Sequence, residues 1–89
     1  MNAITTYKKA KEFFEENIKS EIKIPEYEKF HIWNEEKNET LLTYEEENDD
    51  IYVYIKYSSD GFNKKINLFA RMRNYKKDYH ISTDIDIYL

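Results

Sequence analysis

The spacing of apolar residues changes once along this chain, and the change limits the folds that the chain can adopt. Before residue 20, apolar residues recur three or four positions apart, at Tyr7, Ala10, Phe14 and Ile18. That spacing is typical of one face of an α-helix. After Pro25, apolar and polar residues alternate almost throughout, as they do on the two faces of a β-strand. The sequence therefore predicts one N-terminal helix followed by strands.

The predicted elements cover most of the chain. We expect a helix over about 4–19, with Thr5 or Thr6 as its N-cap, because a hydroxyl can accept a hydrogen bond from an unpaired amide of the first turn. Segments rich in β-branched and aromatic residues predict strands over about 28–34, 40–45, 51–58, 64–73 and 79–88. The helix is the only element available to cover their apolar face. The predicted fold class is therefore α+β, an N-terminal α-helix packed on a five-stranded antiparallel β-meander.

One dipeptide predicts how the strands pair. Asp60-Gly61 is the strongest hairpin signal in the chain, because a type I′ turn needs positive φ at both central residues. A tight turn centred there places Ile55 opposite Ile66 on the core face. A four-residue loop before the last strand then places Lys65 opposite Asp86 on the other face.

Length and composition set the class of protein. The chain has 89 residues, which suits a single domain over 1–89 with one core. Charged residues make up 36% and glycine and proline occur once each, a composition that excludes disordered and collagen-like chains. There is no cysteine, which suits a reducing compartment. Neither a membrane span nor a signal peptide is recognisable. We therefore expect a cytoplasmic protein that does not bind membranes.

The face of the sheet opposite the core is predicted to carry a band of large side chains. These are Trp33, Leu41, Tyr52, Tyr54 and Phe69. Aromatic residues rimmed by charge are typical of contact surfaces, because Tyr, Trp and Arg dominate interface energetics. Alternatively, the sheet curls and buries part of the band as a second small core, or the tyrosines only pair across strands.

Most of the acidity lies in one third of the chain. The net charge is −4, and residues 26–50 carry ten acidic residues against two lysines. Eight of the carboxylates are predicted to form two clusters in consecutive inter-strand loops: Glu35, Glu36 and Glu39 in the first, and Glu45, Glu46, Glu47, Asp49 and Asp50 in the second. Such clusters would attract a cationic partner and repel nucleic acid. The alternative is that they only keep the protein soluble.

The sequence offers little for catalysis or for metal binding. His31 and His80 are the only histidines, and neither stands in a metal-ligand spacing. Asp84 and Asp86 put two carboxylates on one face of a strand, which could serve acid–base work or a divalent cation. A salt bridge between Asp86 and Lys65 is a simpler role. We therefore expect no catalytic residue, no cofactor, no metal site and no enzymatic activity.

In size, acidity and lack of catalytic motifs, the chain resembles inhibitors encoded by phages or mobile elements, such as anti-CRISPR and anti-restriction proteins, and also bacterial immunity proteins. The resemblance implies an inhibitor whose carboxylates occupy the basic groove of a nucleic-acid-handling protein. It matches no family motif, so no residue role is carried over from it. We predict a protein partner with a basic surface, bound by a monomer or homodimer of this chain.

Two alternatives stay open. The chain could be an immunity or antitoxin protein that neutralises a toxin, which differs from the first interpretation in the partner alone. It could also be a nucleic-acid-binding sheet that stacks bases on Tyr52, Tyr54 and Phe69, with Arg71 and Arg73 beside them. Because the acidic clusters oppose a phosphate backbone, we expect no direct binding of nucleic acid.

Overall fold

The computed structural model describes residues 1–18, 23–46, 51–72 and 77–84, and of residues 72 and 77–84 the backbone alone. The described part contains one α-helix, one short 3₁₀ helix and the strands of a single sheet. These elements are α1 (Ala3–Asn17), η1 (Tyr27–Lys29), β1 (His31–Glu36), β2 (Glu39–Glu45), β3 (Ile51–Ser59), β4 (Lys64–Met72) and β5 (Lys77–Asp84). Within this part of the chain, no helix is long and apolar enough to cross a membrane.

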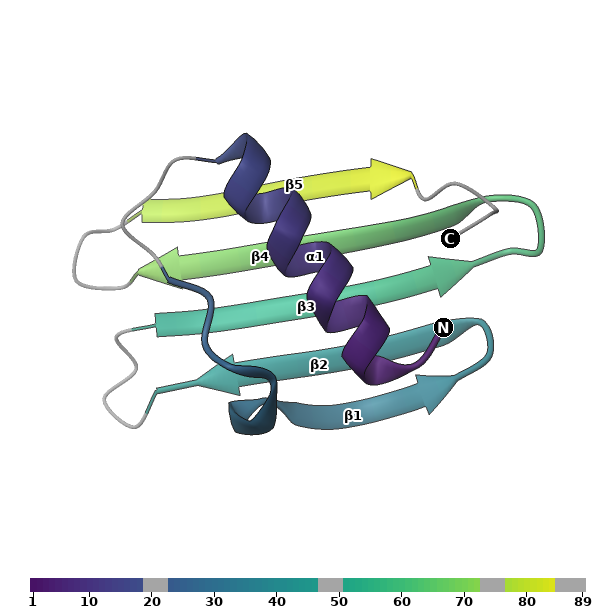
Figure 1. Cartoon of the computed structure of the whole chain (residues 1–89), viewed down its shortest axis with the longest axis horizontal. Helices are drawn as coiled ribbons and strands as arrows, with labels where there is room; N and C mark the ends of the chain where they lie inside the picture. Colours follow the sequence, from purple (N-terminus) through teal and green to yellow (C-terminus); the bar gives the residue numbers. More distant parts are fainter. Residues whose placement is uncertain (19–22, 47–50, 73–76, 85–89) are drawn as a thin grey trace.

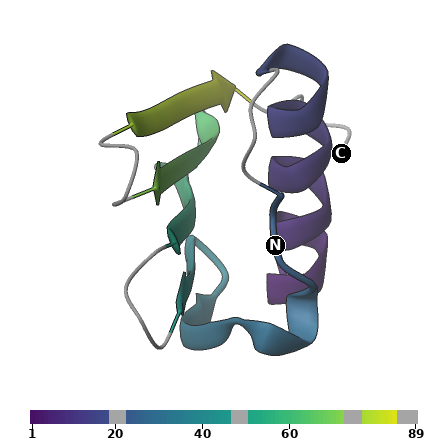
Figure 2. The ribbon, with the colours of Figure 1, turned by 90° about the vertical axis from the view of Figure 1, so that its left-hand side faces the viewer.

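The helix and the sheet form two layers. The strands lie in the order β1-β2-β3-β4-β5, and each is antiparallel to its neighbours. Helix α1 runs diagonally across one face of the sheet (Figure 1) and packs mainly on β2, β3 and β4. Figure 2 shows the layers edge-on, with no other described element against the far face of the sheet. The predicted α+β class, an N-terminal helix on an antiparallel sheet, is confirmed.

The core lies between α1 and the helix-facing side of the sheet, which we call the inner face. Leu42, Val53, Ile55 and Leu68 are at most 1% exposed, and Phe14 of α1 packs among them. The other buried apolar residues are Ala3, Tyr7, Ala10, Ile24, Phe30, Tyr57, Ile66 and Ala70. In the middle of β3 (53–57) and of β4 (66–70), every second residue is therefore buried, as the alternating pattern predicted. Ile32 of β1 is 40% exposed, because β1 is the edge strand and α1 packs chiefly on β2 to β4.

The N-cap of the helix lies three or four residues before the predicted one. Asn2 is the N-cap, and its side-chain Oδ1 accepts a hydrogen bond of 2.9 Å from the Thr5 N–H. The prediction of Thr5 or Thr6 is wrong, because the Thr6 side chain is buried and its hydroxyl donates back to the Asn2 carbonyl oxygen at 2.8 Å. Asparagine is among the strongest N-cap residues, and Ala3 behind it fits the core.

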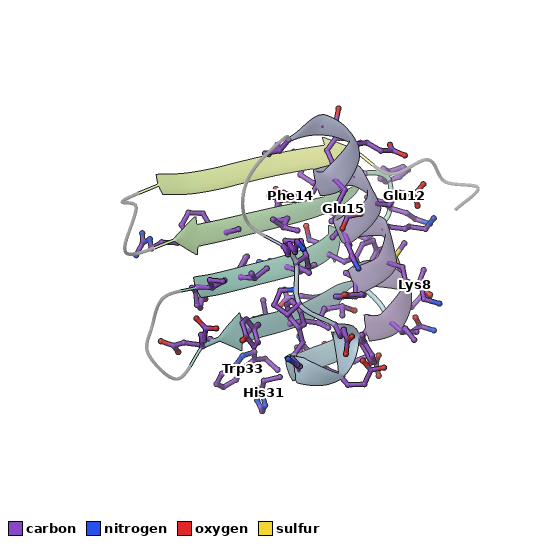
Figure 3. All side chains as sticks on the ribbon, turned by 60° about the vertical axis from the view of Figure 1, so that its left-hand side comes forward. Lys8, Glu12, Phe14, Glu15, His31 and Trp33 are labelled. Carbon is purple, nitrogen blue, oxygen red and sulfur yellow. The ribbon has the colours of Figure 1, made fainter. Side chains whose placement is uncertain are left out.

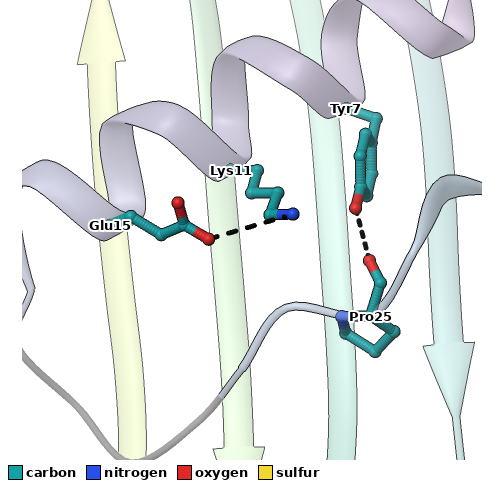
Figure 4. A network of polar contacts seen from close by, with 4 residues as sticks. All are labelled: Tyr7, Lys11, Glu15 and Pro25. Atoms are coloured by element: carbon teal, nitrogen blue, oxygen red, sulfur yellow. Dashed lines mark hydrogen bonds and ion pairs between the residues drawn. The ribbon is translucent and has the colours of Figure 1, made fainter.

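A polar contact ties the segment after the helix to the helix itself (Figure 4). The Tyr7 hydroxyl donates to the carbonyl oxygen of Pro25 at 2.5 Å. Lys11 lies 5.9 Å from the centroid of the Tyr7 ring and 4.0 Å from Glu15. Burial raises the pKa of Tyr7, although the charge of Lys11 opposes the shift. The phenol therefore stays neutral at physiological pH and can donate this bond.

The β3–β4 hairpin is paired two residues away from the predicted register. Ile55 lies opposite Leu68, not opposite Ile66, because the turn is a four-residue loop over 60–63 that follows the Ser59–Lys64 pair. The Asp60 carboxylate stabilises this longer loop. Its Oδ1 accepts hydrogen bonds from the Phe62 N–H at 3.0 Å and from the Asn63 N–H at 2.7 Å. A shift of two residues leaves every side chain on its predicted face.

The pairing of the last strand is shifted in the same way. β5 begins at Lys77, so Lys65 lies opposite Asp84 and the predicted pairing with Asp86 is wrong. The backbone register also places Asp78 opposite Arg71. Residues 85–89, which the predicted last strand included in part, lie outside the described residues, as does Asp86.

Candidate functional site

The exposed side of the sheet, opposite α1, is the candidate site, and we call it the outer face. A β-bulge shapes its edge. Ile32 pairs with Leu42 while Asn34 pairs with Leu41, so Trp33 is the extra residue of β1. Trp33 contacts Thr43 and Asn34 contacts Glu39, and these two partners lie on the same side of β2. The bulge therefore puts two consecutive residues of β1 on the outer face.

The bulge also moves one predicted site residue to the inner face. After it, Glu35 pairs with Thr40, whose side chain is fully buried beneath the helix. The Glu35 carboxylate accepts a hydrogen bond from the Ala3 N–H, and the Thr40 hydroxyl donates to the Met1 carbonyl oxygen at 2.8 Å. An anionic group at a helix N-terminus satisfies an unpaired amide and complements the helix dipole. Glu35 was predicted in the first inter-strand loop, which is wrong, because it lies in β1 and joins the start of α1 to the sheet.

Among the described residues, Trp33 is the most exposed large hydrophobic side chain of the outer face. It is 64% exposed, and its indole Nε1–H donates to the Thr43 hydroxyl at 2.6 Å. The ring meets His31 edge-on, with 4.4 Å between ring centroids and 76° between planes. Figure 3 shows both labelled side chains together at the β1 edge. The indole is therefore held in one orientation while most of its surface faces solvent, as an interface anchor requires.

Half-buried aromatic residues continue the outer face across β3 and β4. Tyr54 pairs with Phe69, and the Tyr52 and Phe69 rings lie 6.3 Å apart. The guanidinium of Arg71 lies 5.3 Å from the centroid of Phe69, within the range of a cation–π contact. Burial, together with the nearby Tyr54 and the Glu45 carboxylate, raises the pKa of Tyr52. The structure thus brings Trp33, Leu41, Tyr52, Tyr54 and Phe69 to one face, as predicted, and leaves each of them at least partly exposed.

Over β1 to β4, the charges of the outer face are divided between its two halves. The acidic side chains Glu36, Glu39 and Glu45 belong to β1 and β2, whereas the basic side chains Lys56, Lys65 and Arg71 belong to β3 and β4. In two rows the backbone pairing places one β3 residue between an acidic and a basic residue. In one row Glu45 pairs with Tyr52, which pairs with Arg71. In another row Glu39 pairs with Ser58, which pairs with Lys65.

Most of the predicted acidic-loop residues that the structure describes belong to strands. Glu36 ends β1, Glu39 begins β2, and the turn between them contains only Lys37 and Asn38. The prediction of a glutamate-rich loop is wrong there, because a two-residue turn lets pairing extend to the Glu36–Glu39 pair. Glu45 ends β2, and the Glu46 N–H donates to the Ile51 carbonyl oxygen at 3.0 Å. The remaining predicted residues, Glu47, Asp49 and Asp50, lie outside the described residues.

Sequence reasoning missed one exposed aromatic residue. Phe62 is 89% exposed at the tip of the β3–β4 hairpin. Hydrogen bonds hold its loop: the Asp60 N–H donates to the Asn63 carbonyl oxygen at 3.2 Å, and the Gly61 N–H donates to the Ser59 hydroxyl at 3.2 Å. A further hydrogen bond, from the Ser59 N–H to the Asn38 carbonyl oxygen at 3.0 Å, joins this hairpin to the β1–β2 hairpin. The available signal was a phenylalanine directly after the turn glycine, where a polar residue is usual.

The hairpin tip also carries a depression that is open to solvent. It is polar and is lined by Ser58, Ser59, Asp60, Asn63 and Lys65. Over the described ranges, no group of three or more histidine, cysteine, aspartate or glutamate side chains is arranged to hold a metal ion. The outer face is thus the most developed candidate surface of the described chain.

No protein-family model matches this sequence, and no curated protein or solved structure matches it either.

Proposed function

We propose that the protein binds another protein through its outer face and that the contacted surface of this partner is basic. The observation that carries the proposal is the state of Trp33, which is 64% exposed yet fixed by Thr43 and His31. A large aromatic side chain loses little conformational entropy on binding when it is already held in place. Trp33 therefore serves as the anchor of the interface.

The acidic half of the outer face supports the choice of a basic partner. Glu36 and Glu45 are exposed, Glu39 is half-buried, and all three lie near Trp33 on β1 and β2. Opposite charges across an interface accelerate association and select among partners more than they raise affinity. The carboxylates thus steer the partner, and the aromatic side chains hold it.

In this proposal the protein acts as an inhibitor. A basic protein surface often serves to bind the phosphates of nucleic acid. A carboxylate-bearing face that occupies such a surface excludes nucleic acid from it. Inhibitors of the anti-CRISPR or anti-restriction kind and immunity or antitoxin proteins share this physical action, and they differ in the partner that they block.

The test is affinity capture from the source cell, followed by kinetics with the purified partner. A chain with Glu36→Lys, Glu39→Lys and Glu45→Lys should fold normally and associate at least about tenfold more slowly at low salt, because steering is lost. The matched control carries Glu12→Lys, Glu16→Lys and Glu28→Lys, which change three exposed glutamates elsewhere by the same charge. Trp33→Ala should instead speed dissociation. If both triple variants slowed association equally, the acidic half would act only through the net charge of the protein and not as part of the interface.

A nucleic-acid-binding sheet is the second candidate, favoured by the contact of Arg71 with Phe69 beside Tyr54. That arrangement could stack a base and contact its phosphate. The test is fluorescence anisotropy of a labelled single-stranded RNA at several salt concentrations. We expect no binding near physiological salt. Micromolar binding with a steep salt dependence, lost in Tyr54→Ala, would replace the first proposal.

A further inference from the structure

The charged residues of β2 and β4 lie at matching positions on either side of β3. β3 runs along the middle, with acidic residues on β2 at one side and basic residues on β4 at the other. Glu45 and Arg71 occupy the two sides of one row, and Glu39 and Lys65 occupy the two sides of the row at the other end of the strands. A rotation of 180° about an axis along β3 therefore exchanges acidic positions with basic ones, at both ends of the face.

From this pattern we infer that the outer face packs against the outer face of a second copy of the chain, with a two-fold axis parallel to β3. Under that axis β2 of one copy lies over β4 of the other. Glu45 of each copy meets Arg71 of its partner copy, and Glu39 meets Lys65. The interface is isologous, since the same patch serves both copies, and four oppositely charged pairs lie where β2 and β4 cross. At the outer strands the same axis sets Glu36 over the backbone position of Asp84, and both are acidic.

The side chains between the charged rows suit the centre of such an interface. Two rows cross the middle of the face. One holds Thr43, Tyr54 and Phe69, each half-buried in the single chain, and the other holds Leu41, Lys56 and Asn67. Under the two-fold axis Tyr54 meets Tyr54 and Thr43 meets Phe69, whereas Lys56 meets Lys56. The four oppositely charged pairs must outweigh this like-charge contact as well. Stacked antiparallel sheets pack about 10 Å apart with strands aligned to within about 30°, a spacing that aromatic side chains from two faces fill.

The size of the face limits the affinity. Four strands spaced about 4.8 Å apart, each about 25 Å long, cover roughly 500 Å² per copy, or about 1,000 Å² in total. That area lies at the lower end of specific interfaces, so the dimer should dissociate in the micromolar range. A consequence that rests on the proposed function is that a basic partner must compete with the second copy for the same face.

Charge pairing inside one chain is the competing arrangement. Glu45 and Arg71 both flank Tyr52, and the backbone register also places Asp78 next to Arg71. Pairing within one chain and pairing between two copies both predict that Arg71→Glu breaks ion pairs and replaces them with like-charge contacts. They differ in what happens when two variant chains are mixed, because only contacts between chains can be restored by mixing.

The experiment measures mass by sedimentation velocity across the micromolar range. Wild type should reach the mass of two chains. In a dimer of Glu45→Arg chains, or of Arg71→Glu chains, both Glu45–Arg71 contacts between the copies become like-charge contacts. Each variant should therefore dimerise at least about tenfold more weakly than wild type. An equimolar mixture of the two variants should recover the two-chain mass, because each acidic position then meets a basic one. Glu12→Arg, an exposed change on the helix (Figure 3), is the control and should dimerise as wild type does.

Three results would overturn the inference. The first is a wild-type mass of one chain throughout the range. The second is a two-chain mass that neither variant reduces, and the third is a mixture that stays at the mass of one chain although both variants melt as wild type does. These readouts need no partner, so failure of the dimer is distinguishable from failure of partner capture. If Arg71→Glu does not fold, the same mixing design applies to Glu39→Lys and Lys65→Glu.

Discussion

The inner and outer faces of the sheet are made from alternate residues of the same strands, and their compositions differ. Val53, Ile55 and Leu68 on the inner face are aliphatic and at most 1% exposed. Tyr54 and Phe69, their neighbours in sequence, are aromatic and half-buried on the outer face. The inner face contributes stability by removing apolar surface from water. The outer face keeps large side chains partly exposed, and this comparison suggests that stability and binding can be changed separately.

The largest expected effect comes from truncating two adjacent residues, one on each face of the sheet. Leu68→Ala should lower the free energy of unfolding by about 2–5 kcal/mol, because it opens a cavity beneath α1. Phe69→Ala should cost about 1 kcal/mol, since the ring loses only partial burial and its contacts with Tyr52 and Arg71. Urea unfolding measures both values. Equal costs would mean that the outer face belongs to the core as much as the inner face does.

Two adjacent glutamates give the next test. Glu35→Ala should cost about 1 kcal/mol, because it leaves the Ala3 N–H at the helix N-terminus without its carboxylate. Glu36→Ala is the control and should change stability by less than about 0.5 kcal/mol, as exposed surface changes do. Partner capture should show the reverse order. A stability loss for Glu36→Ala that matched Glu35→Ala would contradict the assignment of one glutamate to each face.

The fold was more predictable than the details of the site, for physical reasons. Alternation has a period of two, so it identifies faces whatever the register is. That is why the two-residue shift of the β3–β4 hairpin left Val53 inside and Tyr54 outside. The Asp60 loop was not predictable, since the carboxylate competes with a tighter turn by bonding two amides of its own loop. No glycine or proline marks the bulge at Trp33, so the sequence did not predict that Glu35 would lie in β1 on the inner face.

A smaller effect concerns the loop that sets the register of both faces. Gly61 has a φ of +99°, and no atom lies within 4 Å of an added Cβ. Gly61→Val should therefore cost about 1 kcal/mol through backbone strain alone. Gly61→Asn is the control and should cost less, because asparagine tolerates positive φ better than valine does. Thermal unfolding measures both, and an unchanged midpoint for the valine variant would argue against this loop conformation.

The smallest expected effect is a pH dependence in the same loop. Hydrogen bonds from the N–H groups of Asn63 and Phe62 lower the pKa of the Asp60 carboxyl. The ionised form is favoured in the folded state, so its contribution to stability is fully present above the pKa of a free aspartate, about 3.9. It is lost as the pH falls through the lower, folded value. Asp60→Asn keeps an oxygen that can accept the bonds but cannot titrate.

The difference in urea midpoint between wild type and Asp60→Asn should therefore be constant from neutral pH to about pH 5 and shrink toward pH 3, where wild type loses the ionised carboxylate. Asp60→Ala, which lacks an acceptor, should be less stable than Asp60→Asn at every pH. If the curves of wild type and Asp60→Asn stayed parallel down to pH 3, the carboxylate would not hold the loop in its charged form. The four-residue turn, and with it the two-residue shift that sets which outer-face residues pair, would then need another cause.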